Sequence, residues 1–427
     1  MSDHLPQDLV TKILVRLPVT ALLRCRCVSK AWRGLIDSPR FSKLQIEHSA
    51  TTGKNAILFI SELHGDYVVD EYVNGLHRGT SSTPRAQTSG TDPRSGFALI
   101  GSCNGLLCFA CDSEKVLISN PATKHGCFMP FTLSGKQPGT GVYKFTASGN
   151  NLIYNSGFGF GYDSISDDYK VVEILQVFKP EENSLQSVLV SYGVWSNSCV
   201  EVNFPYILLG LRKTGAFVGG AVHWIAGRHE DPDSDDTLSE LVIIGFDVEL
   251  NESREVPQPD YTVWEPFNMV IGELGKCLCL FANYKDKFVD VWVMKEYGVK
   301  ESWSLLFKVP HPGLCYNDEI KPLGFSVTGQ EVLLQMDGKK LVWYDLKDPK
   351  KVAAAEKITV RGLNGKSVNA VVCYGSLVSP YGKVPPVVEE VKVDKQQEKP
   401  GSRRKKKKKN QRKERDDFLS AGFKLNL

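Results

Sequence analysis

Apolar residues in the first part of the chain, residues 5–44, recur at a helical spacing. One set follows steps of three and four, which predicts a helix with a single apolar face. This set comprises Leu9, Val10, Ile13, Leu14 and Leu17. Lys12 and Arg16 fall on the opposite face of that helix. Pro6 suits its first turn, and Pro18 ends it.

Two further short helices are predicted by their capping residues. Thr20 is placed to cap a helix that carries Leu22 and Leu23, and Ser29 is placed to cap the next one. A Ser-Pro pair at 38–39 closes that helix. Three or four helices in about 40 residues cannot bury all their apolar side chains against one another. We therefore expect another surface to cover part of this module.

The pattern changes between residues 97 and 378. Short runs of β-branched and aromatic residues alternate there with turn residues every eight to twelve positions, and no helical period persists. The runs group into five loosely similar packets of about 40 to 50 residues, which is typical of four-stranded propeller blades. We expect a sixth packet to form when residues 367–378 pair with early strands near residues 56–73. Joining both ends of the chain in this way would close the ring of blades.

Charge is concentrated at the end of the chain. The 427 residues carry a net charge of +3, but residues 399–415 contribute +10, which leaves −7 for the remainder. Such a block of like charges predicts a disordered tail over residues 381–427. The basic run in this tail resembles a nuclear-import signal. It consists of Arg403, Arg404, Lys405, Lys406, Lys407, Lys408 and Lys409. A nucleic-acid contact or a solubilising tail are the alternatives, although no aromatic residue is interleaved for base stacking.

Other features favour a protein of the nucleus, the cytoplasm or both. The first residues lack a basic stretch followed by an apolar core, and no apolar run approaches the ~18 residues of a membrane span. We therefore expect neither a secretion signal nor a membrane segment. The eleven cysteines are odd in number and lie among apolar neighbours, which favours reduced thiols. Residues 80–95 are rich in Ser, Thr, Pro and Gly and are expected to form a mobile insertion.

Two stretches imitate ligand-binding motifs. Gly157, Gly159 and Gly161 form GxGxG rather than GxGxxG, and no helix is predicted after them, so we interpret them as part of a strand rather than a nucleotide site. Asp167 and Asp168 belong to DSISDDYK, which lacks the spacing and the flanking helices of a calcium loop. Together with Asp163 they are expected to form a hairpin turn whose Asp and Ser side chains bond to the backbone.

Neither a metal site nor a catalytic residue is predicted. The zinc candidates are Cys103, Cys108, Cys111, His125 and Cys127. The CFAC stretch ends an apolar strand, where side chains three positions apart point to opposite faces, so buried thiols are favoured. His223 precedes Trp224 in an apolar run and is expected to be a packed, hydrogen-bonded histidine near the inner edge of a blade. No cofactor is expected.

The first stretch, LPQDLVTKILVRLPVTALLRCRCVSKAWRGLI, resembles an F-box. An F-box is the helical module by which adaptors dock onto the Skp-type linker of cullin-type ubiquitin ligases. The resemblance implies a set of residues that pack on the linker or order the helices that do so. They are Leu5, Pro6, Leu9, Ile13, Leu14, Leu17, Pro18, Leu22 and Val28. The alternative is that these residues are core residues that cap the following domain.

The β region resembles the kelch-like F-box-associated domain of plants, on pieces such as SCNGLLCF, SNPATK, FGYDSISDDYKVV and GGAVHWIA. The expected fold is mainly β, with an N-terminal α module followed by a β-propeller-like domain of about six blades. The expected divisions are the F-box at 1–45, a connecting region with early strands at 46–96, the F-box-associated domain at 97–380 and the tail at 381–427.

These resemblances imply a non-catalytic, substrate-recognition adaptor of an SCF-type ubiquitin ligase. It would bind the Skp-type linker, and through it a cullin and a RING subunit, while the β domain binds an unidentified target protein. Two alternatives remain open at this point, a kelch-like propeller enzyme and a nuclear nucleic-acid-binding propeller. Membrane partners are not expected, and nucleic acid is disfavoured.

Overall fold

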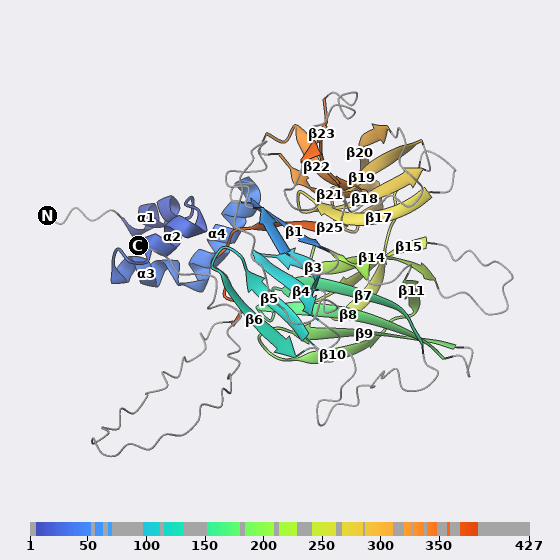
Figure 1. Ribbon diagram of the computed structural model, residues 1–427, viewed down its shortest axis with the longest axis horizontal. Helices are drawn as coiled ribbons and strands as arrows, with labels where there is room; N and C mark the ends of the chain where they lie inside the picture. The colour runs from blue at the N-terminus through green and yellow to red at the C-terminus, as the bar shows by residue number, and fades with distance from the viewer. Residues whose placement is uncertain are drawn as a thin grey trace, which may run out of the picture.

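The computed structural model of the chain contains a small helical module beside a ring of β-sheets (Figure 1). The residues that the structure describes are 6–52, 56–62, 67–70, 97–111, 115–130, 152–179, 184–208, 213–228, 241–261, 267–284, 287–310, 320–326, 328–336, 340–347, 357–358 and 368–382. The predictions for Leu5, the 80–95 insertion and the basic run at 403–409 lie outside these ranges. None of the described helices is long and apolar enough to cross a membrane.

The helical module consists of four helices. They are α1 (Gln7–Leu14), α2 (Val19–Cys25), α3 (Lys30–Ile36) and α4 (Pro39–Thr52). The predicted Ser29 cap is confirmed, because its Oγ accepts a hydrogen bond from Trp32 N at 3.1 Å. The predicted Thr20 cap is wrong. Pro18 occupies the N-cap position of α2, and Thr20 lies inside that helix, because proline supplies the extended backbone that precedes a first helical turn.

The strands form six sheets, which we name A to F in ring order. Sheet A contains β25 (Val368–Tyr374), β1 (Ala56–Glu62) and β2 (Tyr67–Asp70). Sheet B contains β3 (Phe97–Cys103), β4 (Leu106–Cys111), β5 (Lys115–Asn120) and β6 (His125–Pro130). Sheet C contains β7 (Leu152–Asp163), β8 (Asp168–Lys179), β9 (Ser184–Gly193), β10 (Cys199–Asn203) and β12 (Lys213–Thr214).

Sheet D contains β11 (Tyr206–Leu208), β13 (Ala216–Val218), β14 (Ala221–Arg228), β15 (Leu241–Asp247) and β16 (Glu252–Val256). Sheet E contains β17 (Phe267–Leu274), β18 (Cys277–Tyr284), β19 (Phe288–Met294) and β20 (Trp303–Pro310), with a short 3₁₀ helix η1 (Lys300–Ser302) before β20. Sheet F contains β21 (Ile320–Phe325), β22 (Glu331–Met336), β23 (Lys340–Asp345) and β24 (Lys357–Ile358). All strand pairs are antiparallel except β7 with β12.

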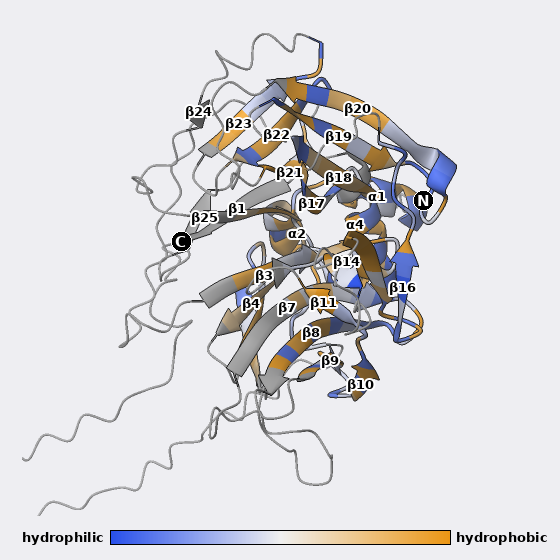
Figure 2. Cartoon of the chain, turned by 90° about the vertical axis from the view of Figure 1, so that its right-hand side faces the viewer, coloured by the Kyte–Doolittle hydropathy of each residue, from blue (hydrophilic) through white to orange (hydrophobic). Residues whose placement is uncertain are grey.

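Strands of consecutive sheets contact one another in the order β25, β3, β7, β14, β17, β21 and back to β25. The sheets therefore form a closed ring, as Figure 2 shows from the side opposite the helices. Closure joins the two ends of the β region, because β25 pairs antiparallel with β1 along its whole length. The predicted sixth packet is thus confirmed. At the boundary between sheets F and A, Gln335 Oε1 accepts a hydrogen bond from Ala370 N at 2.9 Å.

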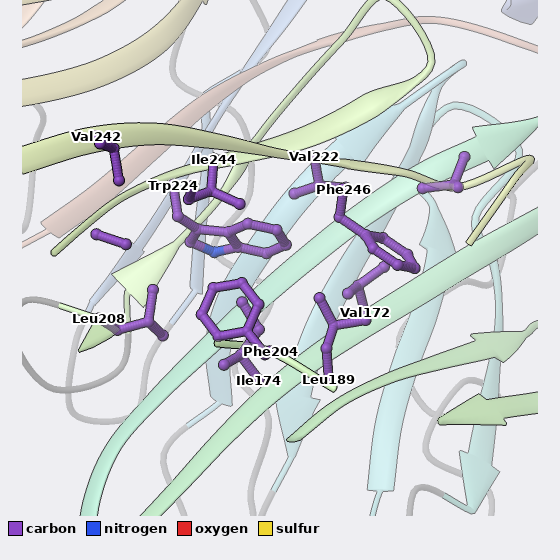
Figure 3. Packing of buried hydrophobic residues seen from close by; sticks show 12 residues of the cluster. Val172, Ile174, Leu189, Phe204, Leu208, Val222, Trp224, Val242, Ile244 and Phe246 are labelled. Atoms are coloured by element: carbon purple, nitrogen blue, oxygen red, sulfur yellow. The ribbon is translucent and has the colours of Figure 1, made fainter. Parts of the chain in front are cut away.

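Apolar side chains fill the spaces between sheets. Figure 3 shows one such space, where Trp224 and Ile244 of sheet D pack against Ile174 and Leu189 of sheet C. Similar clusters lie between sheets B and C, D and E, E and F, and A and B. Sheets B to E therefore bury both of their faces, which explains the near-continuous apolar runs of their inner strands.

The three glycines of the GFGFGYD stretch lie within β7, as predicted. A Cβ atom added at Gly157 would stand 2.7 Å from Leu208 Cδ1, and one at Gly159 would overlap Val222 Cγ1. Both clashing side chains belong to sheet D. The glycines therefore allow sheet D to approach sheet C, and the space beside them is filled by protein rather than by a nucleotide.

Three hairpins share the same turn chemistry. Asp163 Oδ1 accepts hydrogen bonds from Ile165 N and Ser166 N, both at 3.0 Å. Asp247 and Asn120 do the same for the backbone two and three positions later in their own turns. In each hairpin the residue four positions after the Asx side chain has a positive φ. The predicted Asp-Ser turn at 163–168 is confirmed, and its carboxylates are occupied by backbone and side-chain groups of the protein itself.

Glu173 of β8 is a buried carboxyl group with an unpartnered oxygen. It is 2% exposed, and its Oε1 atom has no hydrogen-bond partner among the described residues. Because burial disfavours the charged form, the pKa of Glu173 rises to about 8.

Substitution of Gly159 by Ala should destabilise the ring. The added methyl group enters occupied space between sheets C and D, so we expect the free energy of unfolding to fall by ~1–3 kcal/mol. Gly34 in α3 is the matched control, because a Cβ there meets nothing within 4 Å. Gly34→Ala should be neutral or stabilising by up to ~1 kcal/mol. Urea denaturation measures both, and equal effects of the two substitutions would contradict the packing argument.

Glu173 should make the stability of the protein fall with rising pH. The folded protein keeps this proton from about pH 4.5 to about pH 8, whereas the unfolded chain loses it near 4.5, so stability is lost across that window. Glu173→Gln removes the titration. We expect the thermal midpoint of the variant to exceed that of the wild type increasingly as pH rises toward about 8. A constant difference between the two midpoints across this range would rule out the assignment.

Candidate functional site

The apolar residues of α1 divide into two groups. Leu14 is 1% exposed and packs with Leu22 in the core of the helical module. Leu9 and Ile13 lie on the outside of the same helix, with exposed fractions of 46% and 54%. Val28, in the connection between α2 and α3, is 65% exposed. The module therefore presents large apolar side chains to solvent that its own core does not use.

This division corrects the predicted geometry of the helix. The single apolar face proposed from the sequence is two faces, because Val10, Leu14 and Leu17 turn inward while Leu9 and Ile13 turn outward. The predicted polar positions are confirmed, since Lys12 and Arg16 are both exposed. Hydrophobic spacing of three and four cannot separate two adjacent apolar stripes on one helix.

The other residues predicted for linker binding cap the helices or pack inside the module. Pro6 is the N-cap residue of α1, and Pro18 is the N-cap residue of α2. Leu17 is half-buried and packs against the core of the module. Pro6, Leu17 and Pro18 thus shape the helices, whereas Leu9, Ile13 and Val28 form the exposed surface. Leu5 lies outside the described residues.

The core of the helical module includes a residue from the far end of the chain. Leu377 packs against the cluster of Leu14, Leu22, Ile36 and Phe41. In α4, the buried Gln45 side chain donates a hydrogen bond to Gly375 O at 3.0 Å and another to Ser49 Oγ at 2.9 Å. The segment that follows β25 therefore joins the helices to the ring.

This segment, residues 375–382, is called the C-terminal strap below. Its main anchor is Asn120, a fully buried residue at the end of β5. Asn120 Nδ2 donates to Ser376 O at 3.0 Å and to Val378 O at 2.8 Å. Its Oδ1 atom accepts from Ala122 N and Thr123 N of its own turn. One amide thus holds both a hairpin of sheet B and the strap.

The last part of the strap contacts β6 of sheet B and the connection between β9 and β10 of sheet C. Pro380 O accepts a hydrogen bond from Trp195 Nε1 at 3.3 Å and one from Cys127 Sγ at 3.2 Å. Tyr381, which the sequence assigned to the tail, donates from its hydroxyl to Gly126 O at 2.7 Å. A further link runs directly from the helices to sheet C, where Lys43 Nζ of α4 lies 3.2 Å from Asp167 Oδ1. The helical module is therefore attached to the ring at several points.

The histidine candidate has a structural role. His223 is fully buried, with Nδ1 3.0 Å from Ala216 O and Nε2 2.7 Å from Tyr297 Oη. The carbonyl can only accept, so Nδ1 carries the proton and Nε2 accepts from the Tyr297 hydroxyl. Burial lowers the pKa of His223 to about 4, so the ring is neutral at physiological pH. Both nitrogens are engaged, and the predicted packed histidine is confirmed.

The cysteine candidates are buried or partnered thiols where the structure describes them. Burial raises the pKa of Cys103 well above its ordinary value and that of Cys127 to about 11. Cys108 is fully buried. The side chain of Cys111 lies outside the described residues. Within the described ranges, no group of three or more His, Cys, Asp and Glu side chains could hold a metal ion.

Comparison with known proteins agrees with this architecture. Residues 2–44 match the F-box domain family, and residues 80–379 match the F-box associated beta propeller domain family. "F-box protein CPR1" of Arabidopsis thaliana is 30% identical over 447 residues that cover 99% of each chain. "F-box protein At4g22390" is 28% identical, also over 99% of each chain. "F-box/kelch-repeat protein At3g23880" is 30% identical over 78% of this chain and 86% of the relative.

The helical module with its exposed surface and the closed propeller thus correspond to an F-box joined to an F-box-associated propeller domain. The chain belongs to the family of plant F-box proteins that carry a C-terminal F-box-associated propeller domain. The resemblance inferred from the sequence is confirmed, and so is the mainly β fold with an N-terminal α module.

Sequence reasoning missed the residues that join the two parts. Gln45 and Leu377 carry no local signal, because each acts through a partner more than 300 positions away. Asn120 does carry a signal, since the Asn-Pro pair of SNPATK is typical of a turn in which the amide caps the following backbone. That signal predicts the turn but not the two bonds to the strap.

Replacement of Asn120 by Ala should destabilise the connection between F-box and ring. The substitution leaves two buried carbonyls and two turn N–H groups without their partner, and one unsatisfied buried group alone costs ~1–3 kcal/mol. We expect a clear loss in thermal midpoint and faster proteolysis in the strap. Ser379→Ala is the control, because Ser379 Oγ only accepts from Tyr381 N in an exposed turn. Equal stability of the two variants would contradict the anchoring role.

Proposed function

We propose that this protein is the substrate-recognition adaptor of an SCF-type cullin ubiquitin ligase. In this proposal the F-box binds the Skp-type linker, and through it a cullin and a RING subunit, while the propeller holds a target protein. The chain itself supplies no catalytic group. We expect it to act in the nucleus, the cytoplasm or both, and the import-like run at 403–409 is the reason to include the nucleus.

One observation carries the proposal. The helical module has a complete core, to which Leu377 contributes from the strap, yet Leu9 and Ile13 remain exposed. The alternative that the helices simply cap the ring requires these residues to face the ring. They do not, because α4 and the strap make the contacts with the sheets. Large apolar side chains exposed next to one another are typical of a surface that another protein covers.

The attachment of the F-box to the ring supports a mechanism by proximity. A target bound to the propeller would be held at a fixed distance and angle from the linker, because Gln45, Asn120 and Lys43 tie the two parts together. Transfer of ubiquitin from a conjugating enzyme to a target lysine then becomes effectively intramolecular. The end of the ring opposite the helices, which faces the viewer in Figure 2, points away from the linker surface and is our proposed target side.

Charged substitutions on the exposed face of α1 should abolish linker binding. The double variant Leu9→Asp, Ile13→Asp places two carboxylates in an apolar interface, so we expect at least a ~100-fold rise in Kd for the purified Skp-type linker. Binding can be measured by calorimetry on the full chain. Both side chains are already exposed, so the thermal midpoint should change little.

Leu250→Asp provides the matched control for that experiment. Leu250 is an equally exposed aliphatic residue, 61% accessible, at the tip of the β15–β16 hairpin of the ring. It should leave linker binding unchanged. Failure of the wild-type chain to bind the linker, or loss of binding with Leu250→Asp but not with the α1 variant, would refute the proposed docking surface.

A further inference from the structure

The helical module is strongly basic, and most of its cations form no ion pair with the described residues. Residues 6–52 contain eight Lys or Arg residues and only three Asp or Glu residues. Asp37 is already paired, with Arg26 at 2.7 Å and Arg33 at 3.6 Å. Lys43 is paired with Asp167 of the ring. The exposed residues Lys12, Arg16, Arg24, Lys30 and Arg40 form no ion pair within the described part of the chain.

Some of these cations border the exposed apolar residues. Lys12 lies three positions after Leu9, and Arg16 lies three positions after Ile13, so each is a neighbour on the surface of the same helical segment. Lys30 follows Val28 by two residues at the start of α3. The outer surface of the F-box is therefore an apolar centre with positive charges around it.

Charge also decides which partner can cover this surface. The tail of the same chain carries the +10 of residues 399–415 and would be repelled by it. The F-box of a second copy would be repelled for the same reason. An apolar surface bordered by carboxylates fits both the Leu9 and Ile13 side chains and the cations beside them.

We propose that the partner surface that covers Leu9 and Ile13 is an apolar groove bordered by Asp and Glu residues, and that Lys12 and Arg16 accelerate its association. The inference rests on the proposed function, since it describes the chemistry of the linker that this F-box accepts. Exposed rim charges add little to affinity once a complex has formed, because water and salt screen them. Their effect lies in steering the encounter, so it should appear in the association rate.

The test measures association and dissociation rates of the full chain with the purified Skp-type linker over ionic strengths from about 0.02 M to about 0.5 M. For the wild type we expect the association rate to fall about tenfold or more across this range, with little change in the dissociation rate. In Lys12→Glu, Arg16→Glu the rate at low salt should be reduced by a similar factor, and its salt dependence should be weak. The association rate of Lys12→Gln, Arg16→Gln at low salt should lie between those of the wild type and the charge-reversal variant. This neutral variant still tests the inference if charge reversal disturbs α1.

Lys295→Glu is the matched control for net charge. Lys295 is an exposed cation on sheet E of the ring, where it follows β19, and it should leave the rates unchanged. The inference is overturned if wild type and the Lys12, Arg16 variants share one salt dependence, or if Lys295→Glu slows association as much as they do. Neither result would affect the proposed function, since a complex still forms. Failure of the wild type to bind at any salt concentration would overturn both.

The only other partner that the charges allow for the Leu9 and Ile13 surface is a second copy of this chain. Its propeller could bind there because the chain outside the F-box and the tail is negatively charged. Light scattering of the chain alone at low salt distinguishes this case. A concentration-dependent dimer that Lys12→Glu, Arg16→Glu abolishes would overturn the assignment to an acidic linker. A monomer that binds the linker in a salt-dependent way supports it.

Discussion

The side chain of Asn120 is the contact on which the joining of the two parts most depends. Its carbonyl end caps a hairpin of sheet B, and its amide end holds the backbone of the C-terminal strap at two carbonyls. The strap in turn supplies Leu377 to the F-box core and Gly375 O to Gln45. Because Asn120 is fully buried, water cannot replace any of these bonds. One amide group in a β-hairpin therefore fixes the strap, and the bonds of Gln45 and Lys43 add to the attachment of the F-box to the propeller.

The attachment to the ring explains why apolar residues of α1 can remain exposed. An isolated bundle of this size would need its apolar residues for its own stability. Here α4 and the strap supply part of that stability, so Leu9 and Ile13 remain exposed. In the proposed function, the same attachments fix where the linker sits relative to the ring. The contacts between the F-box and sheets A, B and C thus account both for the exposed surface of α1 and for its orientation relative to the ring.

Much of this fold could be predicted from the sequence, because its determinants are local. Alternating apolar runs, Asx turns such as that of Asp163, and the Ser29 cap each act within a few residues, and the structure confirms them. Closure by β25 and β1 could also be predicted, since both ends of the region had unpaired strand patterns. The sequence could not show which apolar residues of α1 face inward and which face outward. That division depends on how α2, α3 and α4 pack against α1 in the folded protein. The roles of Gln45 and Leu377 were inaccessible for the same reason, since their partners are distant in the chain.

The position of Leu377 has a consequence for the synthesis of the protein. The F-box helices leave the ribosome first, but the residue that joins their core comes more than 300 positions later, after the strand that closes the ring. Domains of a nascent chain usually fold in order from the N-terminus. Here the docking module reaches its final form only when nearly the whole propeller has been made. A chain that terminates early would therefore lack the completed F-box core. In the proposed function, such a fragment could not occupy the ligase without also being able to hold a target.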